Sequence, residues 1–68
     1  MYYPNLRAEM ARKKVKGYEL AAALGIRQAT LSVKLNGKSD WTLEESRAAK
    51  LFIGTAMPLE LLFKREEG

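Results

Sequence analysis

Residues 17–37 decide the fold and read GYELAAALGIRQATLSVKLNG. Leucines recur at helical spacing on both sides of Gly25, which predicts one helix over about 17–24 and another over about 28–36. Gly25 supplies the positive φ that ends the first helix and bends the chain sharply. Ala21 has a small side chain, so the second helix can pack closely across the first. Two short helices joined at an angle by a tight turn form a helix-turn-helix.

Residues on either side of this stretch predict three more helices. Asn5 is a good N-cap and begins a first helix. Thr42 and Glu45 form a capping box, which starts a fourth helix that Gly54 closes. Pro58 suits the first turn of a short fifth helix. No segment alternates polar and apolar residues as a strand does, so we expect an all-α fold, a compact bundle of five helices.

Apolar spacing indicates which sides of these outer helices face the core. A chain of 68 residues supports one modest core, so residues 1–68 are expected to form a single domain. The last apolar segment either contributes to a dimer or only closes the bundle, and Trp41 is expected to cover the edge of the core. The expected inward-facing residues are Leu6, Met10 and Ala11 in the first helix, Leu43, Ala48, Leu51 and Phe52 in the fourth, and Leu59, Leu62 and Phe63 in the last.

The composition argues against several classes of function. The chain contains no Cys and no His, so it lacks thiolate metal ligands, cysteine nucleophiles and the commonest general base. We therefore expect no enzyme, no metal site and no cofactor. The N-terminus lacks the pattern of a secretory signal, and no apolar run approaches the ~20 residues that cross a bilayer. We expect a cytoplasmic protein that binds no membrane and, lacking a second domain, no small-molecule ligand.

The charge is divided unevenly along the chain. Twelve Lys and Arg against eight Asp and Glu give a net charge of +4. Residues 1–38 carry eight basic and two acidic side chains, whereas residues 39–68 carry four basic and six acidic ones. Such an asymmetry indicates either a face adapted to a polyanion or the solvated surface of a small basic protein.

The ordered set of residues in and around the two motif helices resembles the lambda-repressor/Cro type of helix-turn-helix proteins, the XRE family. The resemblance implies a double-stranded DNA-binding transcriptional regulator whose second motif helix enters the major groove. It also implies a homodimer with half-sites about one helical turn apart. The run 30–38 is similar to that of small phage Cro-like regulators, so we expect a Cro-like repressor of a phage or prophage. The residues that carry the resemblance are Glu19-Leu20-Ala21, Leu24-Gly25-Ile26, Thr30-Leu31-Ser32, Leu35-Asn36-Gly37-Lys38, Thr42-Leu43 and the closing Leu61-Leu62-Phe63.

Four residues on the outward side of the predicted helix 28–36 are candidates for reading bases. Gln28 can bond the N6 and N7 atoms of an adenine, and Ala29 and Val33 can contact thymine methyl groups. Ser32 can bond a base or a phosphate. As an alternative, Ala29 and Val33 form an apolar contact with a protein partner, in a helix-turn-helix interaction module such as an antitoxin or the partner of an anti-repressor.

Phosphate contacts are expected at both ends of this helix. By the resemblance, Asn36 and Lys38 match family positions that hold the DNA backbone beyond the end of the helix. Arg27 lies at its start, where a capping Ser is frequent, and would reach a phosphate there. Family members commonly begin the first motif helix with Ser or Thr followed by Gln, whereas this chain has Lys16 and Gly17. The ammonium group and a backbone amide at the helix start can take over that contact.

A basic cluster precedes the first motif helix. It either touches the DNA backbone or only lies in solvent at a helix C-terminus, where cations are favourable. Tyr18 can donate its hydroxyl to a phosphate or pack in the core. The residues considered as additional phosphate contacts are Arg12, Lys13, Lys14 and Tyr18.

Lys34 departs from the family pattern, because that position near the end of the second motif helix is usually aliphatic. We expect Leu35 to supply the buried contact, while the Lys34 stem lies along the surface and its ammonium stays in water. The rotation of the helix 28–36 about its axis is therefore left open by the sequence.

Overall fold

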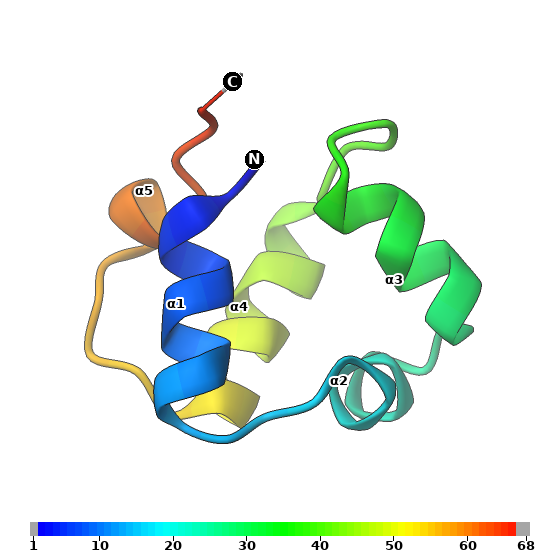
Figure 1. Ribbon diagram of the computed structural model, residues 1–68, viewed down its shortest axis with the longest axis horizontal. Coiled ribbons are helices and arrows are strands. Elements are labelled where there is room, and N and C mark those ends of the chain that lie inside the picture. The colour runs from blue at the N-terminus through cyan, green and yellow to red at the C-terminus, as the bar shows by residue number, and fades with distance from the viewer. Residues whose placement is uncertain (1, 67–68) are drawn as a thin grey trace.

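In the computed structural model, which describes residues 2–66, the chain folds into five helices and no strand (Figure 1). The expected all-α bundle is confirmed. None of the helices in this range is long and apolar enough to cross a membrane. The helices are α1 (Pro4–Arg12), α2 (Gly17–Leu24), α3 (Gln28–Leu35), α4 (Leu43–Ile53) and α5 (Leu59–Leu62).

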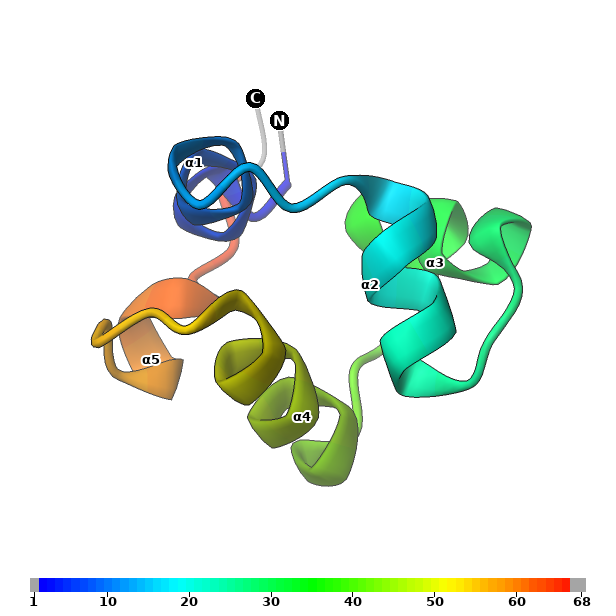
Figure 2. The same cartoon turned by 90° about the horizontal axis from the view of Figure 1, so that it is seen from below.

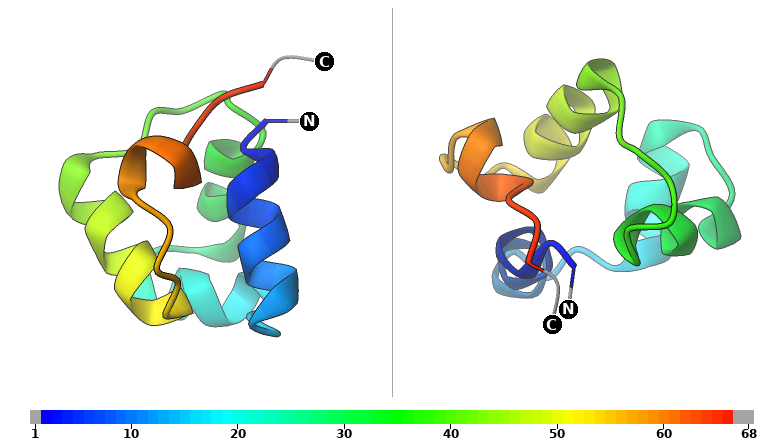
Figure 3. Two further views of the ribbon diagram at one scale, coloured as in Figure 1. Left: turned by 90° about the vertical axis from the view of Figure 1, so that its left-hand side faces the viewer. Right: turned by 90° about the horizontal axis from the view of Figure 1, so that it is seen from above.

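The helices are arranged so that α3 forms one side of the molecule. In Figure 1, α1 and α5 lie on the left, α3 lies on the right, and α4 lies between them. α2 packs against both α3 and α4, and α5 packs against α4 and α1. Figure 2, seen from below, shows α2 and α3 together on one side of the molecule and α1 and α5 on the opposite side. The first and last described segments of the chain run together at one end of α1 (Figure 3).

One core lies between the helices. Its four largest fully buried side chains are leucines contributed by α1, α2, α3 and α5. Trp41 covers one edge of the core, as expected, and its ring lies 4.9 Å from that of Phe63, centroid to centroid. The buried apolar residues are Tyr3, Leu6, Met10, Leu20, Ala21, Leu31, Leu35, Ala49, Ile53 and Leu62.

The prediction for the inward side of α4 is wrong. Its exposed side carries the residues expected inside, namely Leu43, Ala48, Leu51 and Phe52. The buried side carries Ser46, Ala49 and Ile53. The Ser46 hydroxyl is satisfied within the helix because its Oγ donates to the Thr42 carbonyl at 2.9 Å, so this polar side chain can lie on the buried side. Apolar spacing alone cannot reveal a buried side built from Ser and Ala.

The prediction for the start of α1 is also wrong. Tyr3, in the left-handed conformation with φ 53°, is the N-cap, and Pro4 occupies the first turn. Asn5 lies inside the helix, where its Nδ2 donates to the Leu61 carbonyl at 2.8 Å and joins α1 to α5. Ala11 is exposed, and Glu9 lies on the buried side in its place.

The other helix ends agree closely with the sequence. α2 has the predicted bounds, Gly54 closes α4, and the Thr42–Glu45 capping box is present. α3 ends at Leu35, one residue before the predicted end. Pro58 is the N-cap of α5 rather than a residue of its first turn.

A buried carboxylate ties α1 to the segment that connects α4 and α5. The Thr55 hydroxyl donates to Glu9 Oε1 and accepts a hydrogen bond from the Met57 amide at 3.1 Å. Arg12 Nε lies 3.2 Å from Glu9 Oε2. The Thr55 hydrogen bond lowers the pKa of Glu9; burial opposes this shift, and the charge of Arg12 supports it.

We expect acid to weaken the fold through Glu9. Its pKa in the folded protein lies below the ordinary value of 4.5, so the ionised carboxylate stabilises the fold above that pH. This contribution is lost as the pH falls from about 4.5 through the folded pKa. Glu9→Gln should therefore lower the free energy of unfolding more at pH 7 than at pH 3, measured by urea denaturation.

The matched control is Glu66→Gln, which neutralises an exposed carboxylate in the C-terminal segment. This variant should follow the wild-type pH dependence. A loss of stability in Glu9→Gln that is equal at the two pH values would contradict the role given to the ionised carboxylate.

Candidate nucleic-acid interface

The bend between α2 and α3 follows from one left-handed glycine. Gly25 has φ 71° and caps α2. The amides of Gly25 and Ile26 donate to the carbonyls of Ala22 and Ala21, at 3.1 and 3.0 Å, so the last turn of α2 is satisfied. Ile26 then packs against the core. The chain leaves in a new direction and forms α3 across α2, as the sequence predicted.

α3 buries one narrow side and exposes the rest. Leu31, Lys34 and Leu35 face inward, and the other five side chains are exposed. Val33 is 42% exposed although it is aliphatic. The structure brings together on the exposed part of this helix the four residues predicted to read bases, Gln28, Ala29, Ser32 and Val33.

The expectation that the Lys34 ammonium stays in water is wrong. Lys34 is only 7% exposed, and its Nζ donates to the Asp40 carbonyl at 2.9 Å and to Glu45 Oε1 at 3.1 Å. The ammonium is buried because these two acceptors replace water. The hydrogen bond from the Thr42 amide lowers the pKa of Glu45; burial opposes this shift, and Lys34 adds to it.

The two motif helices begin differently from α4. The N-cap residues of α2 and α3 are Lys16 and Arg27, whose side chains have no acceptor and make no capping hydrogen bond in the described structure. At α2, Glu19 Oε1 accepts from the Lys16 amide at 2.8 Å, which is one half of a capping box. Thr42 completes both halves at α4. The starts of α2 and α3 thus combine first-turn amides with an exposed cation.

Arg7, which the sequence did not single out, holds the other end of α3. Arg7 Nη2 lies 3.4 Å from both the Leu35 carbonyl and Asn36 Oδ1, so a cation of α1 lies at the C-terminus of α3. Asn36 is the C-cap and is exposed. No local pattern marks Arg7, because its partners lie far away in the chain.

Both ends of the chain hold the loop that carries Lys38. Arg65 Nη2 donates to the Gly37 carbonyl at 3.2 Å, and its guanidinium lies 5.2 Å from the centroid of the Tyr2 ring. Gly37 has φ 75°, and a Cβ at this position would overlap Tyr2. Lys38 itself is exposed. The chain ends therefore fix the backbone from which Lys38 projects.

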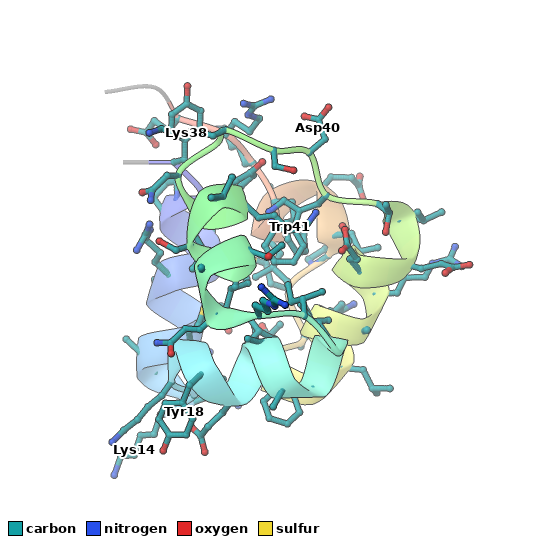
Figure 4. The ribbon with its side chains drawn as sticks, turned by 90° about the vertical axis from the view of Figure 1, so that its right-hand side faces the viewer. Lys14, Tyr18, Lys38, Asp40 and Trp41 are labelled. Carbon is teal, nitrogen blue, oxygen red and sulfur yellow. The ribbon has the colours of Figure 1, made fainter. Side chains whose placement is uncertain are left out.

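Basic and polar side chains border α3 at both ends. In Figure 4, which faces α3, Lys38 lies at the upper end of the surface, and Lys14 and Tyr18 project from its lower end. Tyr18 is 56% exposed, so it does not fill the core. Arg12, Lys13 and Lys14 are all exposed, although Arg12 also pairs with Glu9. Within residues 2–66, no three His, Cys, Asp or Glu side chains lie where they could hold a metal ion.

Comparison with known proteins identifies this arrangement. A family model described as the Cro/C1-type HTH DNA-binding domain matches residues 5–46, a range that runs from α1 into the first turn of α4 and includes the whole motif. No curated protein and no solved structure matches the chain significantly.

Proposed function

Because the chain belongs to the family of Cro/C1-type helix-turn-helix DNA-binding domains, we propose that it is a sequence-specific transcriptional regulator, a Cro-like repressor of a phage or prophage. Residues 1–68 act as one domain, and α3 enters the major groove of double-stranded DNA. The observation that carries the proposal is the exposed side of α3, which no other part of the described chain covers.

Four side chains of α3 read the bases in this proposal. Gln28, in the first turn, reaches an adenine with both its amide donor and its carbonyl acceptor. Ala29 and Val33 lie one turn apart and contact thymine methyl groups, which gives exposed aliphatic side chains an apolar partner. Ser32 bonds a neighbouring base or phosphate.

Phosphates complete the two helix starts that lack a side-chain cap. A phosphate at the start of α2 accepts a hydrogen bond from the Gly17 amide and pairs with Lys16. A second phosphate, at the start of α3, pairs with Arg27. The Asn36 amide oxygen already faces Arg7, so its NH₂ group remains for the DNA backbone beside Lys38. The additional phosphate contacts on the border of the surface are Arg12, Lys13, Lys14 and Tyr18.

Base reading is tested by Gln28→Ala on a duplex that the wild-type chain selects from a randomised pool. We expect the variant to lose ~1–3 kcal/mol of binding free energy on the selected duplex and to accept other base pairs at one position. Gln28 is exposed, so its removal leaves the fold intact. Fluorescence anisotropy with the selected duplex and its single-base variants measures both effects.

An equal loss on the selected and on a random duplex would remove Gln28 from the base-reading set. If the wild-type chain selects no sequence and binds no duplex, the alternative is favoured: a protein-interaction module that uses Ala29 and Val33 as an apolar contact, as an antitoxin or the partner of an anti-repressor does.

Lys38→Ala tests a phosphate contact. The variant should bind all duplexes more weakly by a similar factor, because a phosphate contact carries no sequence information. The slope of log K against log salt should become shallower by about one unit. Lys64→Ala removes an exposed lysine outside the motif and serves as the control with an unchanged slope. An unchanged slope in Lys38→Ala would show that Lys38 stays away from phosphate.

A single domain covers only a few base pairs, so we propose that the chain acts as a homodimer. Leu62 is buried and Phe63 packs against the core, so both close the bundle. Three large apolar side chains, Leu43, Leu51 and Phe52, remain exposed on the outer side of α4. In this proposal a second copy of the chain covers them, with Leu51, the most exposed of the three, at the centre of the contact.

Leu51→Lys should dissociate this dimer. Leu51 is 84% exposed, so the monomer fold tolerates lysine, as circular dichroism should confirm. The dimer dissociation constant, measured by analytical ultracentrifugation, should rise about tenfold or more, because a buried ammonium without a partner costs more than ~1.4 kcal/mol. Ala56→Lys adds the same charge at another exposed position and should leave the dimer unchanged. An unchanged dissociation constant for Leu51→Lys would place the interface elsewhere.

A further inference from the structure

We propose that Lys34 is a positioning residue, which sets the rotation of α3 about its own axis through the ion pair of its buried ammonium with the half-buried Glu45. This inference rests on the function proposed above, because the rotation of α3 decides which side chains face the DNA.

The buried side of α3 has only three members, and two of them are leucines. At about 100° per residue, Leu31 and Leu35 point only about 40° apart. Contact between aliphatic groups is not directional, so two leucines fit a core over a range of rotations. Lys34 points about 60° away from Leu31, on the side opposite Leu35. Its side chain ends in an ammonium whose hydrogen bonds require definite distances and directions.

The acceptors of the ammonium are themselves held in place. Glu45 Oε1, which lies 3.1 Å from Lys34 Nζ, also accepts from the Thr42 amide at 2.9 Å. The Thr42 hydroxyl in turn accepts from the Glu45 amide at 3.1 Å. The second acceptor is the Asp40 carbonyl in the connection to α4. Lys34 is thus tied to the capped first turn of α4, and α4 packs against α2.

A modest rotation is sufficient to disturb recognition. Side chains reach about 5–6 Å from a helix axis, so a rotation of about 20° moves their ends by about 2 Å. Groups that make directional contacts must be held within about 0.5 Å of their productive positions. The proposed base-reading contacts of Gln28 and Ser32 would therefore change, although the Lys34 ammonium bonds Asp40 and Glu45 rather than either of them.

The pair is suited to positioning more than to stability. Replacing a buried ion pair with apolar side chains of similar volume is often neutral or stabilising, whereas removing one partner leaves an unpaired charge. The ammonium faces the interior, so Lys34 neutralises no phosphate. When both charges are removed, a positioning role therefore predicts a loss of base selectivity without a matching change in stability or in the salt dependence of binding.

The experiment compares three variants with the wild-type chain on the duplex selected from a randomised pool, its single-base variants and a random duplex. Lys34→Met keeps the apolar stem. Lys34→Met combined with Glu45→Gln leaves no unpaired charge and keeps a side chain that suits a capping box. Lys64→Met is the control for the loss of one exposed positive charge.

Both Lys34 variants should keep the fold and the wild-type salt slope, and their affinity for the random duplex should change by less than about threefold. Discrimination between the selected duplex and its single-base variants should fall about tenfold, a factor comparable to the usual cost of one mismatched base pair. Lys64→Met should keep the wild-type discrimination. If Lys34→Met does not fold, the double variant provides the same measurement.

Unchanged discrimination in a folded Lys34 variant would overturn the inference and leave the proposed function intact. A uniform loss on all duplexes with a shallower salt slope would also overturn it, because Lys34 would then act as a phosphate contact. If the wild-type chain selects no sequence, the proposed function fails, and the positioning role fails with it.

Discussion

Only a small part of the surface of α3, the helix proposed to enter the DNA groove, attaches it to the rest of the molecule. α3 has eight residues, and five of its side chains are exposed. The remaining three, Leu31, Lys34 and Leu35, attach it to the body. The two leucines bury apolar surface, and Lys34 makes directional hydrogen bonds to the Asp40 carbonyl and the Glu45 carboxylate. Burial holds the helix on the body, and the hydrogen bonds add a directional restraint.

The helix starts differ between the motif and the rest of the chain: the start of α4 has a complete cap, whereas the starts of α2 and α3 lack a side-chain cap. α4 lies outside the helix-turn-helix motif formed by α2 and α3, and it has a complete capping box at Thr42. The N-cap residues of α2 and α3 are Lys16 and Arg27, whose side chains cannot accept hydrogen bonds and place a cation where the helix dipole disfavours it. Such starts cost about 1 kcal/mol each relative to a good cap. An anion would satisfy both, which agrees with DNA as the partner.

The end of α3 depends on residues from the whole chain. Arg7 of α1 bonds the Leu35 carbonyl and the Asn36 side chain, and Arg65 of the C-terminal segment bonds Gly37. The ring of Tyr2 closes over Gly37, where only a hydrogen atom fits. The N-terminal and C-terminal segments therefore both support the loop that carries Lys38 and contribute to the geometry of the proposed interface.

Local sequence determined where most helices begin and end and that Leu31 and Leu35 of α3 face the core. Gly25, Gly54 and the Thr42–Glu45 box act within one turn of the backbone, and the leucines of α3 identify its buried side by spacing alone. Tertiary structure decided that α4 buries Ser46 and Ala49, that Asn5 bonds α5, and that the Lys34 ammonium is inside. Those outcomes depend on which helices pack together and on hydrogen-bond acceptors outside the same helix, which no local pattern contains.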